Sequence, residues 1–364
     1  MQPDKKIVII SDFAYPITGG TEKYVFEEAE FLAKTNKVRI ISPVWSPKNK
    51  AENFKYRKFS KNLDMIRFKG LLRRNKIIKP LKFLWNLIRY CRDCDVINGH
   101  YYSNALVAIL FAKLFRKKSV ITLYEVENLM GRRAVKLLNK ADQIIVISDS
   151  LKEYAEKAGL RNVEVISPWI EIKDEKFNQN KLKEQYGLKG KKIILFIGRI
   201  IKTKGVEYLI KAMPEVKKKC SNAHLVMIGN KIDQELLELP AKLGIAEACE
   251  FKGFVTEKEK EDYCKLCDTL VYPPYVKGGF GFVLLEAMKY GKTVIGSDNW
   301  GVPDAVGDAG IIIPQKNQAA MNKALITILT NDKIRNDYAK KAITQAKRFE
   351  KKKVLNEFKK ILLE

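Results

Sequence analysis

The residues best suited to chemistry lie in loops that contain glycine and follow apolar runs. The loop within residues 272–288 carries three glycines and then opens a helix near Phe282. The N–H groups at the start of a helix bind anions, and glycine lets a phosphate approach the backbone closely. Glu286, one turn into this helix, could accept hydrogen bonds from the two hydroxyls of a ribose. An ordinary strand–turn–helix with a surface glutamate fits these residue types about equally well.

A second loop, at residues 196–205, joins an apolar run to two or three cations. Arg199 offers a planar fork for phosphate oxygens, and Lys204 offers a mobile point charge. One interpretation is a second phosphate site, and the usual alternative is a solvated basic loop.

Two further candidates lie in the first half of the chain. Gly19 and Gly20, followed by Thr21 and Glu22, predict a flexible loop that leads into a capped helix. His100 ends an Asn-Gly-His stretch after an apolar run and is one of only two histidines in the chain. A lone histidine is more often structural than catalytic, although a strand end is a favourable place for a catalytic one.

Two Cys-x-x-Cys pairs raise the question of a metal. Cys91 with Cys94 and Cys264 with Cys267 would together supply the four thiolates of a zinc site. Both pairs lie in helix-like sequence far apart in the chain, where this spacing only places small apolar groups on one face. We therefore expect no metal site, and six cysteines in 364 residues do not indicate a disulfide scaffold.

The elements that must position these groups are short β-branched runs that alternate with helical patterns. Nearly continuous apolar runs such as residues 193–197 suit parallel strands that are buried on both faces. The alternation predicts an α/β protein with two doubly wound parallel sheets, one in each half. Ligands bind beyond the carboxyl ends of such strands, so the cleft between the sheets is the expected site. The expected strands are residues 6–10, 37–42, 95–98, 119–123, 143–148, 163–167, 192–197, 224–228, 250–252, 269–272, 293–297 and 310–313.

Length and segment composition complete this outline. A chain of 364 residues predicts two domains at roughly 150 residues each. The polar stretch of residues 171–191 is the expected linker, and residues 342–363 form a basic amphipathic helix. The first apolar run, residues 7–10, is too short for a signal peptide, and no apolar stretch reaches 18 residues. We therefore expect a cytoplasmic protein, at most peripheral on the inner face of the cell membrane.

The chain is strongly basic, with 68 Lys and Arg against 42 Asp and Glu and a net charge of +26. This balance indicates an anionic partner, which is a nucleic acid, an anionic membrane or a phosphorylated substrate. The excess is concentrated in residues 48–92: from Lys48 to Arg92 there are 15 basic and two acidic residues, with seven aromatic residues among them.

Within this basic segment, Pro80 suits the first turn of a helix. The apolar residues that would share one face of this helix are Ile77, Leu81, Leu84 and Ile88. The pattern fits a peripheral helix on an anionic membrane, or a helix that packs its apolar face on the sheet. We expect the apolar stripe to pack on the sheet and the surrounding charge to contact an anionic membrane.

Together these motifs resemble glycosyltransferase family 4 (glycosyl transferases group 1), a large group of retaining enzymes with the GT-B fold. The resemblance covers essentially the whole chain and is most specific at residues 198–314. The matching motifs are Gly19 to Glu22, His100, Gly198-Arg199 through Lys204-Gly205, Gly278 through Glu286-Ala287-Met288, Gly291 to Ser297 and Gly301 to Asp304.

The resemblance implies an α/β GT-B architecture, in which two Rossmann-like, doubly wound parallel-sheet domains face each other across a cleft. Residues 1–170 would form an acceptor-binding domain, with a carboxyl-terminal helix at 346–364 packing back on it. Residues 171–345 would bind the nucleotide-sugar. Gly19 and Gly20 would let the amino-terminal loop close over the donor phosphates.

The resemblance assigns the catalytic roles to Arg199, Lys204 and His100. Arg199 and Lys204 would neutralise the donor pyrophosphate as the glycosidic bond breaks, in place of a metal or another cofactor. The helix start at Gly281, Phe282 and Val283 would hold the same phosphates through backbone N–H groups.

The rest of the donor would be bound by three further groups. Glu286 would take the ribose hydroxyls, His100 would contact the transferred sugar, and the base would lie near Phe254 and Val255. One departure stands out: the first glutamate of the family's EX7E pair is replaced by Gly278. The carboxylate that touches the donor sugar in relatives is therefore missing here.

The function implied is a retaining glycosyltransferase that uses a UDP- or GDP-sugar. Its acceptor would be lipid-linked or a precursor of a cell-surface glycan, and an anionic membrane would contact the basic segment. A nucleic-acid-binding protein is one alternative, but no RRM, KH, helix-turn-helix or zinc-finger signature supports it. The other is a GT-B epimerase or hydrolase of nucleotide-sugars. The sequence identifies neither the sugar nor the acceptor.

Overall fold

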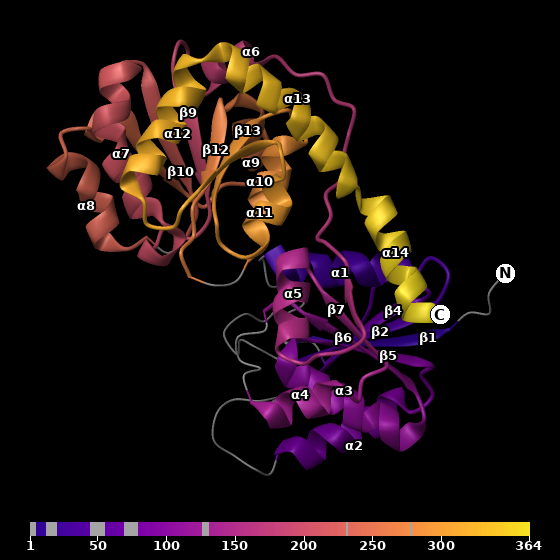
Figure 1. Ribbon diagram of the computed structural model, residues 1–364. Helices are drawn as coiled ribbons and strands as arrows, with labels where there is room; N and C mark the ends of the chain where they lie inside the picture. Colours follow the sequence, from indigo (N-terminus) through magenta and orange to yellow (C-terminus); the bar gives the residue numbers. More distant parts are fainter. Residues whose placement is uncertain are drawn as a thin grey trace. The chain divides into compact units, whose positions relative to one another are not determined.

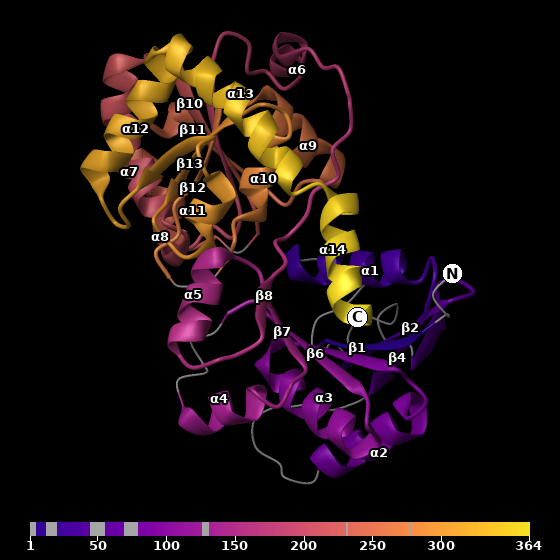
Figure 2. The same cartoon turned by 45° about the vertical axis from the view of Figure 1, so that its right-hand side comes forward.

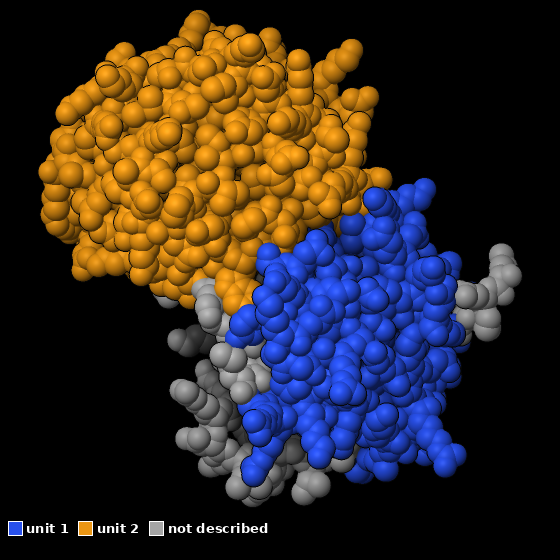
Figure 3. Space-filling model, viewed as in Figure 1, with its two compact units in different colours: residues 1–168, 352–364 blue, residues 169–351 orange. Residues whose placement is uncertain are grey.

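The computed structural model describes residues 5–11, 20–43, 55–68, 79–125, 131–230, 232–276 and 279–364. The chain forms two compact units, one of residues 1–168 and 352–364 and the other of residues 169–351 (Figures 1 and 3). Each unit has its own sheet, and apolar side chains between the sheet and its helices form the core.

The first unit contains an eight-stranded sheet in the order β3-β4-β2-β1-β5-β6-β7-β8. The strands are β1 (Lys6–Ile10), β2 (Lys37–Pro43), β3 (Tyr56–Lys58), β4 (Leu63–Phe68), β5 (Val96–His100), β6 (Lys118–Leu123), β7 (Gln143–Val146) and β8 (Val163–Val165). All paired strands are parallel except β3, which is antiparallel to β4. The order reverses between β1 and β5, and ligands of open sheets bind at such a switch point.

The helices of this unit cover both faces of its sheet. They are α1 (Gly20–Leu32), α2 (Lys79–Cys91), α3 (Tyr101–Phe115), α4 (Arg132–Leu138), α5 (Asp149–Lys157) and α14 (Lys351–Leu363). In both ribbon views, α1 and α14 lie on one side of the sheet and α2 and α3 on the other (Figures 1 and 2). Doubly wound sheets are covered in this way because their strands are apolar on both faces.

The second unit contains a six-stranded parallel sheet in the order β11-β10-β9-β12-β13-β14. The strands are β9 (Lys192–Ile197), β10 (Ala223–Ile228), β11 (Cys249–Gly253), β12 (Thr269–Tyr272), β13 (Thr293–Ser297) and β14 (Gly310–Ile313). Its helices are α6 (Gln179–Gln185), α7 (Val206–Lys219), α8 (Gln234–Lys242), α9 (Glu257–Leu266), α10 (Phe282–Met288), α11 (Gly301–Val306), α12 (Gln318–Thr330) and α13 (Asp332–Arg348). The switch point of this sheet lies between β9 and β12.

Strands β3 and β4 lie in the basic segment of residues 48–92 and were not predicted. Strand β4 pairs with β2, and its Leu63 and Met65 are buried. Asp64, between them, accepts two hydrogen bonds from the Arg39 guanidinium of β2, at 2.6 and 2.8 Å. The sequence pattern did not indicate this strand because charged residues are typical of surface loops. Here the charged Asp64 pairs with a neighbouring strand instead.

Helix α2 lies in the same segment, and Ile88 is the one residue of the expected stripe whose side chain is among those described. Leu87 and Cys91 are fully buried, Ile88 is half-buried and Trp85 is 57% exposed. The side chains of Ile77, Leu81 and Leu84 lie outside the described residues. Among the side chains that are described, the apolar face therefore centres one residue before Ile88.

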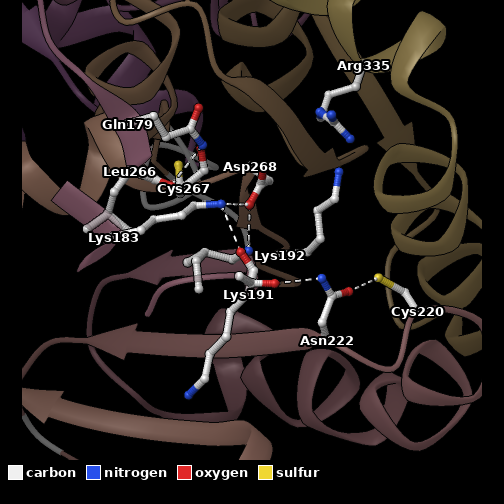
Figure 4. A network of polar contacts seen from close by, with 12 residues as sticks. Gln179, Lys183, Lys191, Lys192, Cys220, Asn222, Leu266, Cys267, Asp268 and Arg335 are labelled. Carbon is white, nitrogen blue, oxygen red and sulfur yellow. Dashed lines mark hydrogen bonds and ion pairs between the residues drawn. The ribbon is translucent and has the colours of Figure 1, made fainter. Parts of the chain in front are cut away.

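The polar stretch of residues 171–191 is not a linker throughout, because it contains α6. Lys183 of α6 forms an ion pair of 2.7 Å with Asp268, and both side chains are less than 10% exposed (Figure 4). Asp268 also accepts a hydrogen bond of 2.7 Å from the backbone N–H of Ile193. These contacts connect α6 to the first residues of β9. They lie at the amino-terminal ends of the strands, whereas the switch-point loops follow the carboxyl-terminal ends.

The single helix expected at the carboxyl terminus is in fact two helices, α13 and α14. At the break, the N–H of Ile170 donates to the carbonyl of Phe349 at 2.8 Å, and the N–H of Lys351 donates to the carbonyl of Ile170 at 2.9 Å. The helix stops here because these backbone groups pair with another chain segment instead of with the preceding turn.

Helix α14 packs in the first unit. Its Val354, Leu355 and Phe358 are buried, and the Lys118 ammonium donates to the carbonyl of Ile361 at 2.8 Å. Within the described part of the chain, no helix is both long enough and apolar enough to cross a membrane.

Candidate active site

The loops that follow β9 and β12 contain most of the predicted donor site. Gly205, at the end of the β9 loop, has a φ of +72°, and a Cβ there would lie 2.0 Å from the carbonyl oxygen of Pro273. Only glycine fits that position, so the two loops can pack directly on each other. The N–H of Tyr275 also donates to the carbonyl of Thr203 at 3.2 Å. The β9/β12 switch point is therefore a single packed structure.

The two predicted cations of this site have no acidic partner among the residues that the structure describes. The Lys204 ammonium donates to the Tyr272 hydroxyl at 2.9 Å and lies 5.3 Å from the centre of that ring. Arg199 is exposed, and no described carboxylate forms an ion pair with Arg199 or Lys204. By contrast, Lys202 in the same loop pairs with Glu235. Two cations with no counterion in the described part of the chain, held beside a strand end, suit an anionic ligand.

The β12 loop leads into α10 through Gly281. Its φ is +81°, and a Cβ there would come within 2.7 Å of Leu284 and 3.1 Å of the Tyr272 ring. Tyr272 therefore lies between the two predicted phosphate elements: its hydroxyl accepts from Lys204, and its ring lies against Gly281, which precedes the start of α10 at Phe282. Gly278, which stands where relatives have the first glutamate, lies outside the described residues.

Glu286 of α10 faces α9, where Lys260 donates to its Oε1 at 2.9 Å. Its Oε2 is buried and has no hydrogen-bond partner among the described residues. Lys260 also lies 3.1 Å from Glu257. Burial alone would lower the pKa of Lys260, but the two carboxylates raise it well above its ordinary value. Lys260 is thus a fixed cation that holds one oxygen of Glu286, while the other oxygen still needs a donor.

The predicted base site lies in the turn between β11 and α9. Phe254 is 75% exposed there and Val255 is half-buried. The turn is held rigidly because Thr256 and Glu259 form a capping box at the start of α9. An exposed phenylalanine on a fixed turn is a suitable surface for stacking an aromatic ligand.

The predicted residues of the first unit lie at the β1/β5 switch point. His100 is the last residue of β5, where the sequence placed it just past the strand, and its side chain is fully buried. Its Nδ1 lies 2.9 Å from the Tyr124 hydroxyl, and its Nε2 lies 3.0 Å from Asn98 Nδ2 and 3.4 Å from Glu28 Oε1. Gly20 is the first residue of α1, and Gly19 lies outside the described residues.

The four cysteines of the two pairs are all buried, and one pair lies in each unit. Burial raises the pKa of the Cys94 and Cys267 thiols to about 12, so they are protonated at neutral pH. No three His, Cys, Asp or Glu side chains of the described residues gather as metal ligands would.

Four residues that the sequence did not single out belong to these sites: Glu28, Tyr124, Lys260 and Tyr272. For Glu28 a signal existed, because it shares a helical face with Val25, Ala29 and Leu32, all buried. Lys260 lies in a run of alternating charges, where nothing distinguishes it from its neighbours. Its partner comes from another element, so only the fold identifies it.

Comparisons with known proteins cover the chain in two parts. The model of the glycosyl transferases group 1 matches residues 178–345, and the model of glycosyltransferase family 4 matches residues 18–174. An uncharacterized glycosyltransferase of Methanocaldococcus jannaschii is 26% identical, over 98% of this chain and 97% of the relative.

A second relative and a solved structure are also similar to this chain. A Campylobacter jejuni N-acetylgalactosaminyltransferase, named for a diphospho-undecaprenol-linked acceptor, is 28% identical over 79% of this chain and 83% of its own. The crystal structure of Anabaena HepE in complex with UDP and glucose is 18% identical, covers 98% of this chain and 99% of its own, and has a TM-score of 0.80. This likeness establishes a GT-B fold with two Rossmann-like domains.

Proposed function

The chain belongs to glycosyltransferase family 4, the glycosyl transferases group 1, and on that basis we propose that it transfers a sugar from a nucleotide-sugar to an acceptor with retention of the anomeric configuration. The observation that carries the proposal is the β9/β12 switch point. Arg199 and Lys204 lie there without described acidic partners, next to a glycine-led helix start.

The second unit would bind the donor and stabilise its leaving group. As the bond from the sugar to the diphosphate breaks, negative charge develops on the phosphate oxygens. Arg199 and Lys204 would stabilise this charge, as preorganised cations do in other transfer reactions. The backbone N–H groups of Phe282 and Val283, after Gly281, would hold the same phosphates.

The nucleoside would extend away from the phosphates. The buried Oε2 of Glu286 would accept a ribose hydroxyl, which supplies the donor that the oxygen lacks. The base would stack near Phe254 and Val255. Both UDP and GDP fit these contacts, and the UDP found in HepE supports the first.

The first unit would bind the acceptor and the transferred sugar, with Gly19 and Gly20 closing over the phosphates and His100 in the sugar site. Because the His100 ring is buried, its contact with substrate would pass through Tyr124. A lipid-linked acceptor or cell-surface glycan precursor is supported by the undecaprenol-linked acceptor in the name of the Campylobacter relative.

Contact with an anionic membrane follows from such an acceptor and from the net charge of +26. The adjacent helices α2 and α3 (Figures 1 and 2) expose large apolar side chains, with Trp85 57%, Leu110 59% and Leu114 62% exposed. Arg89 and Lys113 lie near them in sequence on the same helices. Apolar side chains beside cations bind the interface of anionic bilayers.

A donor panel tests the function. The protein would be incubated with labelled UDP-, GDP- and ADP-sugars, with and without membrane lipid extract. Transfer to lipid, with the anomeric configuration kept, supports the proposal. Release of free sugar alone would indicate a hydrolase, and salt-dependent oligonucleotide binding without donor turnover would indicate a nucleic-acid-binding protein. For the membrane, sedimentation with anionic and neutral liposomes at low salt should show binding to the anionic ones only.

A further inference from the structure

A cavity lies at the amino-terminal ends of the strands in the first unit. It is lined by the first residues of β1, β2 and β4, by the turn between β3 and β4, and by the end of α2. His100, the predicted sugar contact of this unit, is instead at the carboxyl end of β5, which runs parallel to β1. Because a strand of five residues spans about 16 Å, the cavity is not part of the predicted substrate site.

The size of this cavity limits its ligand. Its volume is about 260 Å³, whereas sites for drug-sized ligands measure about 300–1,000 Å³. All of its lining residues belong to the first unit, so its size does not depend on how the two units are arranged. The cavity therefore suits one small group and not a whole nucleotide-sugar.

Cations dominate the charged side chains of the cavity wall. The wall has five basic and two acidic side chains, with a net charge of +3: Lys6, Lys37, Arg39, Lys58, Lys61, Asp64 and Asp93. Asp64 is paired with Arg39 at 2.6 Å. Asp93 is paired with Lys6 at 2.8 Å. The two carboxylates are thus neutralised, and the surplus charge lies on the three remaining lysines.

Lys37, Lys58 and Lys61 have no counterion in the part of the chain that the structure describes. All three are exposed, and the ion pairs of the cavity wall involve only the other two cations. Lys37 begins β2, Lys58 ends β3, and Lys61 lies in the turn that follows. Like charges that gather at one cavity repel each other, so an anion bound among them is stabilised.

Arg39 supplies further hydrogen-bond donors at the same wall. A guanidinium has five N–H donors. In Arg39, two of them hold Asp64 at 2.6 and 2.8 Å, and a third holds the carbonyl of Tyr90 at 2.7 Å. The other two have no partner among the described residues. A guanidinium that is fixed in this way binds phosphate oxygens well.

The turn that carries the lysines between β3 and β4 is itself fixed. The N–H groups of Phe59 and Ser60 donate to the carbonyl of Leu63 at 2.9 and 3.2 Å. The side-chain amide of Asn62 donates to the carbonyl of Ala33, just after α1, at 3.0 Å. Because the backbone is already ordered, binding costs only the ordering of the lysine side chains.

The charge and size of the cavity fit a phosphate monoester best. At pH 7 such a group carries a charge between about −1.5 and −2 and has three acceptor oxygens. A carboxylate carries one charge, which would leave most of the surplus uncompensated. A nucleic acid needs an extended basic surface, and a closed cavity of this size accepts only one of its phosphates.

We propose that this cavity is a second anion site, which binds a phosphate monoester group at Lys37, Lys58 and Lys61. The group belongs either to a small soluble molecule or to the headgroup of a membrane lipid, since both present the same chemistry. The proposal does not depend on the proposed transfer function, because no predicted site residue lines the cavity.

Calorimetric titration with glycerol 3-phosphate, a monoester, and dimethyl phosphate, a diester, tests the site. The protein carries Arg199→Ala and Lys204→Ala, so that the cations of the second unit do not contribute. The monoester should bind at one site and at least tenfold more tightly than the diester. Its affinity should rise from about pH 5 to about pH 7.5, because its second pKa is about 6 and the dianion is the bound form.

Substitution of the lysines locates this binding. Lys37→Gln, Lys58→Gln and Lys61→Gln, combined in the same background, should weaken binding of the monoester at least tenfold. Because the three side chains are exposed, their loss should leave the fold intact, which circular dichroism checks. The control is a triple variant of exposed lysines outside the cavity, with the same loss of charge: Lys136→Gln, Lys140→Gln and Lys157→Gln.

Vesicles identify the source of the phosphate. Phosphatidylcholine vesicles that contain phosphatidic acid, a monoester, are compared with vesicles of equal surface charge that contain phosphatidylglycerol, a diester. Tighter binding to phosphatidic acid, lost in the cavity variant, would assign the site to a lipid headgroup. Equal binding to both vesicles, with glycerol 3-phosphate still bound, would assign it to a soluble molecule. Both results support the anion site.

Two results would overturn the proposal. One is the absence of saturable glycerol 3-phosphate binding together with the absence of a preference for phosphatidic acid. The other is an equal loss of binding in the cavity variant and in the control variant, which would show a general effect of net charge. Neither result affects the transfer function, which the donor panel tests with the cations of the second unit intact.

Discussion

The two switch points of this protein are built on opposite electrostatic principles. At β9/β12, Arg199 and Lys204 face solvent or an aromatic ring, and no described carboxylate neutralises them. At β1/β5, Glu28, Asn98 and His100 are buried, and Glu28 and His100 each have protein hydrogen-bond partners. The same topology thus supports an exposed cationic site in one unit and an enclosed polar network in the other.

The difference matches what each site would have to do. A diphosphate brings its own charge and must also leave, so its site needs cations that remain uncompensated until the ligand arrives. A neutral sugar hydroxyl brings no charge and is recognised by the direction of hydrogen bonds, which a fixed network provides.

The largest effect is expected from the cations of the second unit. Arg199→Ala and Lys204→Ala should each lower kcat by on the order of 100-fold or more, because loss of one group that stabilises developing charge costs about 3 kcal/mol. Initial rates with the active donor measure this. Lys202→Ala is the matched control, since Lys202 lies in the same loop but already pairs with Glu235. Near-normal turnover of both variants would remove the cations from the mechanism.

A second prediction concerns the packing that holds the cationic loop. Gly205 and Gly190 have φ values of +72° and +73°, but a Cβ meets Pro273 at Gly205 and nothing within 4 Å at Gly190. Gly190→Ala should cost about 1 kcal/mol for its backbone conformation alone. Gly205→Ala should cost roughly 2 kcal/mol more, because it overpacks the loop contact. Urea unfolding of both variants measures the difference, and equal losses would refute the close packing.

A smaller effect is expected at the Glu286–Lys260 pair. Here the second unit resembles the first, because a glutamate accepts a hydrogen bond from another side chain of the protein. Lys260→Met leaves the Glu286 carboxylate without its cation beside the phosphate site. UDP should then bind about tenfold more weakly by calorimetry, a change of about 1.4 kcal/mol. Lys258→Met is the control, because Lys258 pairs with Asp262 on the same helix and not with Glu286. Equal affinities in wild type and Lys260→Met would show that the pair has no role in binding.

The smallest effect is expected at Phe254. Because this side chain is 75% exposed, Phe254→Ala should change stability by no more than about 0.5 kcal/mol. It should weaken UDP binding only a few-fold, by loss of about 1 kcal/mol of stacking. Parallel melting and titration experiments separate the two quantities. A large loss of stability with unchanged affinity would place Phe254 in the fold and not in the base site.

The sequence predicted the two parallel sheets because buried parallel strands are runs of apolar residues, as in β9 and β12. The sequence did not predict the elements in which charged side chains form ion pairs within the fold. In β4, Asp64 pairs with Arg39, and in the predicted linker, Lys183 pairs with Asp268. A pattern based on polarity assigns such residues to the surface, although they stabilise a strand and a helix.

The sites show the same division. Loops of glycine and cations after strands can be found from spacing, because glycine and charge are visible in the sequence. The partners Tyr272 and Lys260, and the enclosure of His100 by Glu28 and Asn98, depend on which strands and helices become neighbours. That information is in the topology and not in any local motif.

The proposed mechanism requires Arg199 and Lys204 to bind the diphosphate of the donor. This is tested by calorimetric titration of each diphosphate and its monophosphate, UDP with UMP and GDP with GMP. The four nucleotides are titrated into the wild type and into the Arg199→Ala/Lys204→Ala double variant, and their affinities are compared. The wild type should bind one diphosphate at least tenfold more tightly than its monophosphate, and the double variant should lose that preference. An undiminished preference for the diphosphate in the double variant would show that these two cations do not bind it.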